Sequence, residues 1–349
     1  MLSGSRSSTR SERREQAPCL DVRRSTAIGL VLGVAAMAAA VVYAGIGAVA
    51  QALATLHISG LFVLVLLHVP IVALMGVAWW LAAGEDPPAS QARFIWARFV
   101  RDAAGELLPS LQLGGVVFGL RALGRGPAIT IGAVSASIDG VMELTAKLPY
   151  TLAALVTLLA LAPQHRLARM LSLALGATAL IVAILLFARR RLGASLQAIA
   201  RAMSARWPSV VGLHDGAAGP DLQACFDRIL GQRRRLWSSL ALHLLCWCLG
   251  AAEIWVTFRL LGVDLTWSQA LAIDGTVVGL RTFGWMLPGA AGVQEASYML
   301  VGAVFGLSPA TAIAASFARR ARDLVLGVGT AGIAAAGSAN LALLTHPRR

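Results

Sequence analysis

Long apolar runs separated by short polar stretches make up most of this 349-residue sequence. Such runs lie at 26–50, 59–83, 127–147, 148–163, 168–188, 238–261, 267–287 and 324–344. A helix that rises about 1.5 Å per residue needs about 20 such residues to cross the hydrocarbon core of a membrane. Helices also satisfy their own backbone hydrogen bonds in lipid. The pattern therefore predicts an all-α, polytopic membrane helix bundle of about eight to ten segments.

Two further apolar segments are broken by proline and glycine, and they resemble each other. ELLPSLQLGG at 106–115 is similar to WMLPGAAGVQE at 285–295. Each is followed by a Pro-Ala pair, at 127–128 and at 309–310, that opens an alanine-rich helix. Interrupted segments at corresponding places in two halves are typical of transporter repeats with a site at mid-membrane. The sequence predicts two broken or re-entrant segments in an internal repeat; chance similarity between apolar segments is the alternative.

The polar stretches indicate how the chain is organised. Residues 1–25 carry six arginines and are expected to form a disordered, basic cytoplasmic tail. A single integral membrane domain is expected over 26–345, with a cytoplasmic loop at about 189–237. The stretch 92–110 mixes aromatic residues with arginines, and it predicts an amphipathic helix lying on the membrane surface.

Composition supports the membrane assignment and explains the charge. Hydrophobic residues make up 57% of the chain, charged residues make up 13%, and the mean hydropathy is +0.72. The net charge is +13, but most arginines lie between apolar runs, where they orient a membrane protein by the positive-inside rule. We therefore expect a cytoplasmic N-terminus and no nucleic-acid partner. The four cysteines form no CxxC pair and the histidines are scattered, so neither a metal nor a cofactor is expected.

Charged residues inside the predicted spans are the first candidates for function. Asp139, Glu143 and Lys147 are spaced i, i+4 and i+8, on one face of a helix. Either they neutralise one another, or they form a polar stripe along an aqueous or headgroup pathway. A charge at the bilayer centre costs about 2.5–3.5 kcal/mol, which favours the second interpretation. Asp274 and Arg281, seven residues apart, also share a face and have the same two interpretations.

Glu295 lies in the second broken segment, with no basic residue within ten positions. Its partner must come from elsewhere in the fold, and the candidates are Arg121, Arg281 and the RRARD sequence at 319–323. That sequence has a second interpretation, as a basic loop at the membrane edge before a last span at 324–344.

The break beside Glu295 is produced by Pro288, Gly289 and Gly292. Backbone groups freed by such a break are tolerated at membrane depth only where they are buried in protein or face a wet cavity. The motif therefore predicts the wall of a polar pocket inside the bilayer.

Four other polar residues in apolar runs are given no functional role. His68 and His243, each alone in its run, are interpreted as packed or hydrogen-bonded structural residues. Glu253 and Arg259 are expected to snorkel toward the outer end of their span.

The signature segments resemble a known family. LLPSLQLGGVVFGLRAL and LPGAAGVQEASYMLVGAVFGLSPATAIAASFARRARDL are similar to the two signature regions of the flippase-like membrane domain of lysylphosphatidylglycerol synthases and their stand-alone relatives. GGVVFGLRAL together with PGAAGVQE looks most like the hopanoid-biosynthesis-associated, HpnL-type subgroup. The resemblance covers roughly residues 27–344. Gln294 stands where many relatives are expected to have arginine.

The resemblance implies lipid handling, without the aminoacyl transfer of the synthases. It suggests a lipid transporter or flippase of the bacterial inner membrane that moves hopanoids or a related lipid. The implied partners are a membrane lipid, either hopanoid or phospholipid, and hopanoid-pathway or envelope-transport proteins. A membrane-embedded lipid-modifying transferase and a scaffold for hopanoid-processing enzymes are the alternatives, and no catalytic residue is proposed. The predicted substrate-pathway residues are Pro109, Gly114, Gly115, Arg121, Asp139, Glu143, Arg281, Pro288, Gly289, Gly292, Glu295, Arg322 and Asp323.

Overall fold

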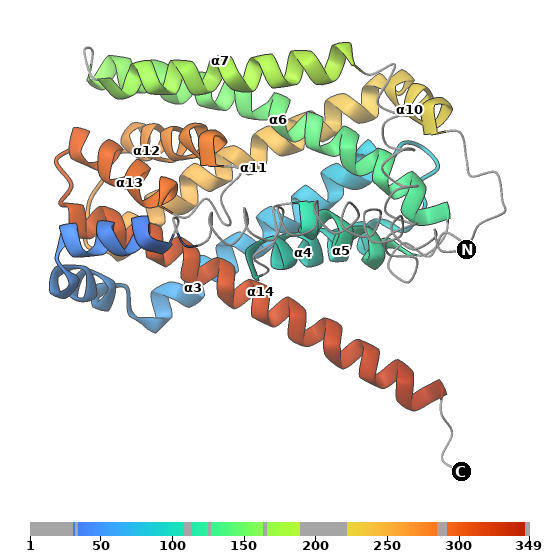
Figure 1. Ribbon diagram of the computed structural model, residues 1–349, viewed down its shortest axis with the longest axis horizontal. Helices are drawn as coiled ribbons and strands as arrows, with labels where there is room; N and C mark the ends of the chain where they lie inside the picture. The colour runs from blue at the N-terminus through green and yellow to red at the C-terminus, as the bar shows by residue number, and fades with distance from the viewer. Residues whose placement is uncertain are drawn as a thin grey trace, which may run out of the picture.

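A computed structural model describes residues 31, 34–107, 113–124, 127–162, 166–188, 222–284 and 292–345 (Figure 1). These ranges are helical and contain no strand. A short helix at Val34–Ala44 precedes α3 (Ile46–Ala82), α4 (Gln91–Leu107), α5 (Leu113–Leu123), α6 (Pro127–Leu161), α7 (Arg166–Phe187), α10 (Leu222–Gly231), α11 (Arg233–Leu260), α12 (Trp267–Leu280), the 3-10 helix η1 (Arg281–Gly284), α13 (Val293–Val304) and α14 (Pro309–Thr345). The predicted all-α bundle is therefore confirmed.

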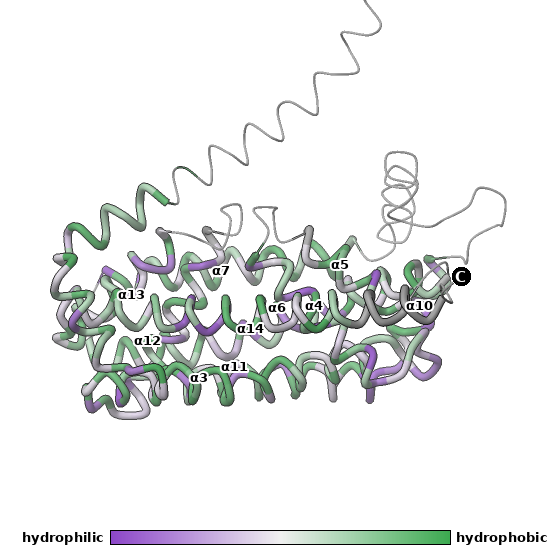
Figure 2. Tube along the Cα trace, turned by 90° about the horizontal axis from the view of Figure 1, so that it is seen from below, coloured by the Kyte–Doolittle hydropathy of each residue, from purple (hydrophilic) through white to green (hydrophobic). Residues whose placement is uncertain are grey.

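Four of the described helices are long and apolar enough to cross a membrane: Ile46–Ala82, Ile131–Leu161, Arg166–Phe187 and Arg233–Leu260. Apolar residues run along most of the trace, and hydrophilic positions lie both within the bundle and at its ends (Figure 2). Ile58 and Phe187 are 88% and 87% exposed, whereas Asp139 and Glu295 are fully buried. This inside-out distribution is that of a multi-pass membrane protein, whose apolar surface faces lipid.

The first two predicted spans are separated by a kink instead of a loop. The backbone leaves helical geometry at His57 (φ 51°, ψ 166°), between two helical parts of α3 and within the predicted connection at 50–59. The interruption between helices lies at Gly45, whose φ of 86° suits glycine. The first predicted span, 26–50, therefore contains an additional break, at Gly45.

α3 and α11 run antiparallel through the middle of the bundle. Arg235, near the start of α11, donates to the carbonyl oxygen of Leu81, near the end of α3, at 3.3 Å. Further along, the Cys246 thiol donates to the carbonyl oxygen of Ile71 at 3.7 Å. Residue numbers therefore fall along α3 as they rise along α11, and Figure 1 shows the two helices crossing the molecule in opposite directions.

The order of the helices repeats in the two halves of the chain. α3, α4, α5 and α6 correspond to α11, α12, α13 and α14: a long helix, two short ones separated by a break, and a long helix that begins at Pro127 or Pro309. The contacts between helices follow the same correspondence. α3 and α4 both pack on α14, and their counterparts α11 and α12 both pack on α6. A two-fold axis between the halves produces this pattern. Since α3 and α11 are antiparallel, the predicted internal repeat is present and it is inverted.

The last helix is longer than the sequence suggested. α14 begins at Pro309 and contains the whole RRARD sequence at 319–323, so this is not a loop at the membrane edge. Alanine-rich sequence on both sides supports an uninterrupted helix. The alternative start of the last span at residue 324 was based on the cost of placing the charges of 319–323 in a membrane. Carboxylates of other helices pair with these arginines, so the helix can include them.

The predicted tail and loop lie largely where the structure gives no description. Residues 1–25 and 189–221 fall outside the described ranges. The end of the predicted loop, 222–237, is helical: it forms α10 and the first turn of α11.

Candidate functional site

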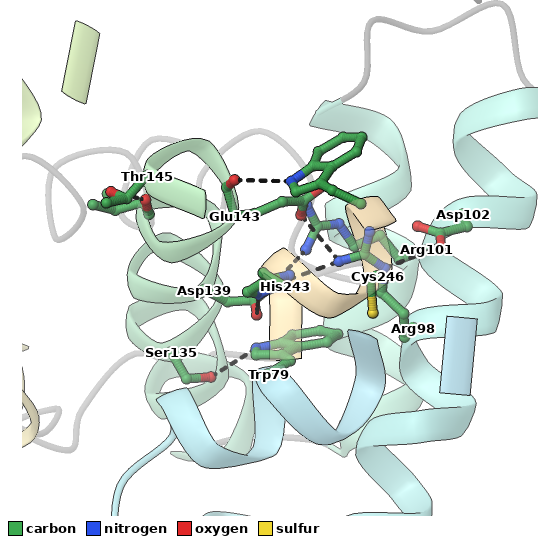
Figure 3. A network of polar contacts seen from close by, with 12 residues as sticks. Trp79, Arg98, Arg101, Asp102, Ser135, Asp139, Glu143, Thr145, His243 and Cys246 are labelled. Atoms are coloured by element: carbon green, nitrogen blue, oxygen red, sulfur yellow. Dashed lines mark hydrogen bonds and ion pairs between the residues drawn. The ribbon is translucent and has the colours of Figure 1, made fainter. Parts of the chain in front are cut away.

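A cluster of paired charges joins α4 to α6. The Arg98 guanidinium donates to Glu143 at 3.1 Å and to Asp102 at 3.0 Å, and Arg101 donates to Asp139 at 3.2 Å (Figure 3). Arg98 is only 5% exposed and Asp139 is fully buried. We refer to these residues, together with His243, as the first charge cluster.

α11 completes this cluster from the second half of the chain. Nε2 of His243 lies 2.9 Å from Asp139 Oδ1, and both side chains are fully buried. Beside them the Trp79 indole donates to Ser135 at 3.0 Å, and the Arg101 guanidinium lies 5.9 Å from the centroid of the Trp79 ring (Figure 3). Asp139 is therefore held by α4 and α11 at once, which ties the two repeats together.

The charged stripe of α6 does not pair with itself. Asp139 and Glu143 pair with the arginines of α4, whereas Lys147 donates to Thr282 of η1 at 2.7 Å. The prediction that 92–110 lies on the membrane surface is wrong for the arginine-bearing face of α4, because Arg98 is buried inside the bundle. An amphipathic pattern shows that one face is polar, and here that face meets carboxylates of another helix instead of headgroups.

Glycines of the first signature allow α5 to pack directly on α4. A Cβ atom at Gly115 would lie 2.4 Å from the Arg101 carbonyl oxygen, and one at Gly119 would lie 2.9 Å from the Arg101 Cβ. No side chain fits at such distances, so the two backbones touch. This contact fixes the part of α4 that carries Arg98 and Arg101.

A second cluster surrounds α14, where three arginines each meet a carboxylate from a different helix. Arg319 donates to Asp274 of α12 at 3.0 Å, Arg320 donates to Glu295 of α13 at 2.6 Å, and Arg322 donates to Glu253 of α11. Successive residues of an α-helix point about 100° apart, so neighbouring arginines reach different neighbours. We refer to these pairs, with Asp323 and His68, as the α14 cluster.

Glu295 fixes the second broken segment to α14. One of its oxygens accepts from Ser316 at 3.0 Å and from Arg320, and the other accepts from the Gly292 backbone N–H at 2.8 Å and from Arg320 at 3.2 Å. Gly292, with φ 80°, turns the chain into α13 just before this carboxylate. The expectation of a partner from RRARD is confirmed, but Glu295 is fully buried in protein and acts as a structural joint instead of facing an open pocket.

Glu253 does not snorkel to the end of its span. It is 4% exposed, and it accepts from both Arg322 and His68, the latter at 2.8 Å. Arg259 does reach the surface, where it pairs with Asp264 at 2.9 Å. The sequence did not indicate that Glu253 faces the interior, because its partners His68 and Arg322 lie on other helices. His68 and His243 are hydrogen-bonded, as predicted.

A small cavity with three ionisable side chains in a mainly apolar wall lies between the two clusters. Its volume is about 30 Å³, and His68, Asp102 and Asp323 line it together with apolar residues of α3, α4 and α14. A space of this size holds one or two water molecules, which His68, Asp102 and Asp323 could hydrogen-bond. Asp102 belongs to the first charge cluster and Asp323 to the α14 cluster, so the cavity connects them.

The ends of the two broken regions approach each other. Glu106, at the end of α4, interacts electrostatically with Arg281, which begins η1, and with Arg320 of α14. A Cβ atom at Gly327 would lie 3.1 Å from Leu107, so α14 also packs against the end of α4. The two signature regions therefore meet inside the bundle.

The predicted substrate-pathway residues divide into three groups. Pro109, Pro288 and Gly289 lie outside the described residues. Gly114, Gly115 and Arg121 belong to α5, and Arg121 is exposed near its end. The remaining residues are brought together in the interior: Asp139 and Glu143 in the first charge cluster, Glu295, Arg322 and Asp323 in the α14 cluster, Gly292 at the start of α13 and Arg281 in η1.

The two halves carry opposite charges at corresponding helices. In the first half the cations lie on α4 and the carboxylates lie on α6, whereas in the second half the carboxylates lie on α12 and α13 and the cations on α14. Sequence reasoning left Arg98, Arg101, Arg319 and Arg320 out of the site. The sequence spacing could have indicated the pairing of α4 with α6. Arg98 and Arg101 are three residues apart on α4, and Asp139 and Glu143 are four apart on α6, so each pair lies on one helical face.

An inverted repeat of apolar helices whose interior holds paired charges defines a multi-pass membrane protein with a polar core. The chain belongs to the family described as the lysylphosphatidylglycerol synthase TM region, whose model matches residues 27–330. This is a membrane-domain family linked to lipid handling. Neither the curated proteins nor the solved structures gave a match.

Proposed function

We propose that this protein is a lipid transporter of the bacterial inner membrane. The observation that carries the proposal is the location of the two charge clusters. They are buried, His243 and His68 each join one cluster to the other repeat, and the cavity that His68, Asp102 and Asp323 help to line lies between them. Membership of a family linked to lipid handling supports the same function.

The physical task of such a transporter is to lower the cost of moving a polar headgroup through hydrocarbon. Burying an unpaired polar group costs roughly 2–7 kcal/mol, and burying a charge costs more. Paired charges between two repeats offer hydrogen bonds along the route, while the lipid tails stay in the bilayer. Rocking of one repeat against the other exposes such a route to each side in turn.

The proposed cargo is a hopanoid or a related lipid, on the basis of the resemblance in GGVVFGLRAL and PGAAGVQE. Within the described residues the ion pairs of both clusters already balance most of the buried charge. Transport driven by a charge imbalance in these clusters is therefore not part of the proposal.

Purified full-length protein in liposomes tests the function. Lipids with a fluorescent headgroup are placed in both leaflets, and a membrane-impermeant quencher reports movement between them. We expect the wild type to move lipid, and Arg98→Gln to slow it about tenfold, which corresponds to about 1.4 kcal/mol in the barrier. Arg259→Gln is the matched control, because it also removes one arginine of an ion pair, but an exposed one.

Two outcomes contradict the proposal. A covalently altered lipid in the product analysis would identify a lipid-modifying transferase. Absence of lipid movement, together with normal cell function of Arg98→Gln at normal protein level, would favour the scaffold. Size-exclusion profiles of both variants establish that they are folded.

A further inference from the structure

Three carboxylates from the two halves of the chain gather where α4 packs on α14. Asp102 and Glu106 are four residues apart, on one face of α4, and Asp323 belongs to α14. Asp102 and Asp323 line the cavity between the two clusters, and His68 of α3 is the third ionisable residue of its wall. Both aspartates repel Glu106 electrostatically. The three carboxylates therefore act on one another across a contact between the first repeat and the second.

The ion pairs of the two clusters leave some carboxylate charge unbalanced. Two arginines meet three carboxylates in the first charge cluster, and three arginines meet four carboxylates in the α14 cluster. Arg281, Lys147 and Glu106 add two cations and one carboxylate beside them. The network that the structure describes therefore contains one carboxylate more than cations. A buried carboxylate without a balancing charge is costly, and it takes up a proton instead.

Glu106 is the carboxylate of this network with the weakest attachment. Asp102 is bound by Arg98 at 3.0 Å, and Asp323 is bound by Arg322. Within the described ranges, by contrast, Glu106 forms neither an ion pair nor a hydrogen bond. It lies one turn beyond Asp102, at the end of α4 and next to the first broken segment. A proton on Glu106 thus costs no described ion pair.

Charged groups from five neighbouring elements surround these carboxylates. Two arginines attract Glu106, but one of them, Arg320, already forms the bidentate contact with Glu295. Because the groups act on one another, a bound proton belongs to the three carboxylates together. The groups that face them are Arg98 of α4, Arg281 of η1, Arg319, Arg320 and Arg322 of α14, His68 of α3, and Glu253 of α11, which is hydrogen-bonded to His68.

A proton at this place holds α4 and α14 together. A protonated carboxyl group donates a hydrogen bond to a neighbouring carboxylate, directly or through a water molecule in the cavity. Ionised carboxylates repel one another, and the repulsion is strong where water is scarce. Loss of the proton therefore favours separation of α4 from α14. These helices belong to different repeats, so their contact is one that changes when the repeats rock.

We propose that Glu106, Asp102 and Asp323 form a proton-binding site that couples lipid movement to a proton gradient. The proton enters from water on one side of the membrane and stays on the carboxylates while α4 and α14 are in contact. It leaves to water on the other side after they separate. The inference rests on the proposed lipid transport and supplies its source of energy. It uses only the charge that remains after the ion pairs have formed.

Proton binding is measured by infrared difference spectroscopy on full-length protein in detergent. We expect the wild type to show the C=O stretching band of a protonated carboxyl group near neutral pH, and to lose it as the pH rises. Glu106→Gln is expected to lack this band, because one negative charge fewer lets the remaining carboxylates ionise. Asp264→Asn is the matched control, since it removes a carboxylate whose side chain is 85% exposed, and it should keep the band.

Two results of this measurement overturn the proposal. One is a wild type without the band, and the other is the same band in Glu106→Gln as in the wild type. Size-exclusion profiles establish that the variants are folded. Asp102→Asn is a second test of the same group, and it too is expected to lose the band.

Coupling is measured in liposomes with a difference of one pH unit across the membrane. Valinomycin and equal potassium concentrations hold the membrane potential at zero, and a trace lipid with a fluorescent headgroup reports its distribution between leaflets. One proton per lipid predicts about a tenfold excess of the lipid in one leaflet for the wild type. Glu106→Gln is expected to leave the lipid evenly distributed, whereas Asp264→Asn should behave like the wild type. An even distribution in the wild type, or a tenfold excess in Glu106→Gln, overturns the coupling.

The outcomes separate this inference from the proposed function. Lipid movement that ignores the pH difference shows that the proton coupling is wrong and that lipid transport stands. A band that depends on Glu106, without any lipid movement, shows that the proton site stands and that lipid transport is wrong.

Discussion

Arg320 of α14 and Glu295 of α13 form a bidentate ion pair, with contacts of 2.6 and 3.2 Å. This pair joins the second broken segment to α14. The same carboxylate accepts the backbone N–H of Gly292, so it also caps α13. Glu295 thus connects the local break in the chain to the tertiary packing of the bundle.

Glu295→Gln is expected to destabilise the protein by about 3 kcal/mol, because it weakens both contacts of Arg320 with this carboxylate and removes their charge attraction in a mostly buried place. Thermal unfolding in detergent measures this. The double variant Glu295→Gln/Arg320→Gln is expected to lose less stability than the sum of the single variants, since it leaves no unpaired charge. Additive losses would show that the pair does not contribute as a pair.

Gly115→Ala is expected to prevent the close contact of α5 with α4, because its Cβ would lie 2.4 Å from a backbone oxygen that cannot move alone. We expect a lower yield of folded protein and a lower melting temperature. Gly140→Ala is the control: nothing lies within 4 Å of its Cβ, and alanine should stabilise α6 by about 0.5–1 kcal/mol. Similar melting temperatures for the two variants would contradict the packing.

Glu253→Gln is expected to cost more stability than His68→Gln. Glu253 accepts from both Arg322 and His68, and Arg322 is 3% exposed and permanently charged, whereas a histidine can remain neutral. We expect a loss of about 3 kcal/mol for Glu253→Gln and about 1 kcal/mol for His68→Gln. Chemical unfolding of both variants in the same detergent gives the order, and the reverse order would show that His68 supplies the more important contact.

The inverted repeat predicts that the loops after α3 and α11 lie on opposite sides of the membrane. Cysteines placed at Glu85 and Asp264, in a background without native cysteine, report this through labelling of intact cells by an impermeant maleimide. Glu85 accompanies Gln232 and α10, next to the arginine-rich stretch, so we expect it inside and Asp264 outside. Labelling of both positions from the same side would exclude the inverted arrangement.

Some of these features could be predicted from the sequence because they are local. Apolar run length predicts helices, and Pro288 with Gly292 predicts an interruption, since each depends on neighbouring residues only. The partner of Glu295 was narrowed to a short set that included RRARD, because a buried carboxylate requires a cation.

The pairing between helices could not be derived in the same way. Arg98 and Arg101 resemble a headgroup-facing pattern until α6 is placed beside them, and Glu253 resembles a snorkelling residue until α14 brings Arg322 to it. Such pairs depend on the register of helices that are far apart in the sequence. Whether a charged face of a helix lies at the surface or in the interior therefore depends on the helix packed against it, which its own sequence does not reveal.

The opposite placement of charge in the two halves has a consequence for direction. In the proposed rocking motion, opening of one half exposes arginines on a short helix, and opening of the other half exposes arginines in the middle of a long one. The inward-open and outward-open forms are therefore not electrostatic mirror images, despite their matching helices. In the proposed transport, a headgroup that enters from one leaflet meets a different sequence of charges from one that enters from the other, so the slowest step of the crossing should lie nearer one leaflet than the other.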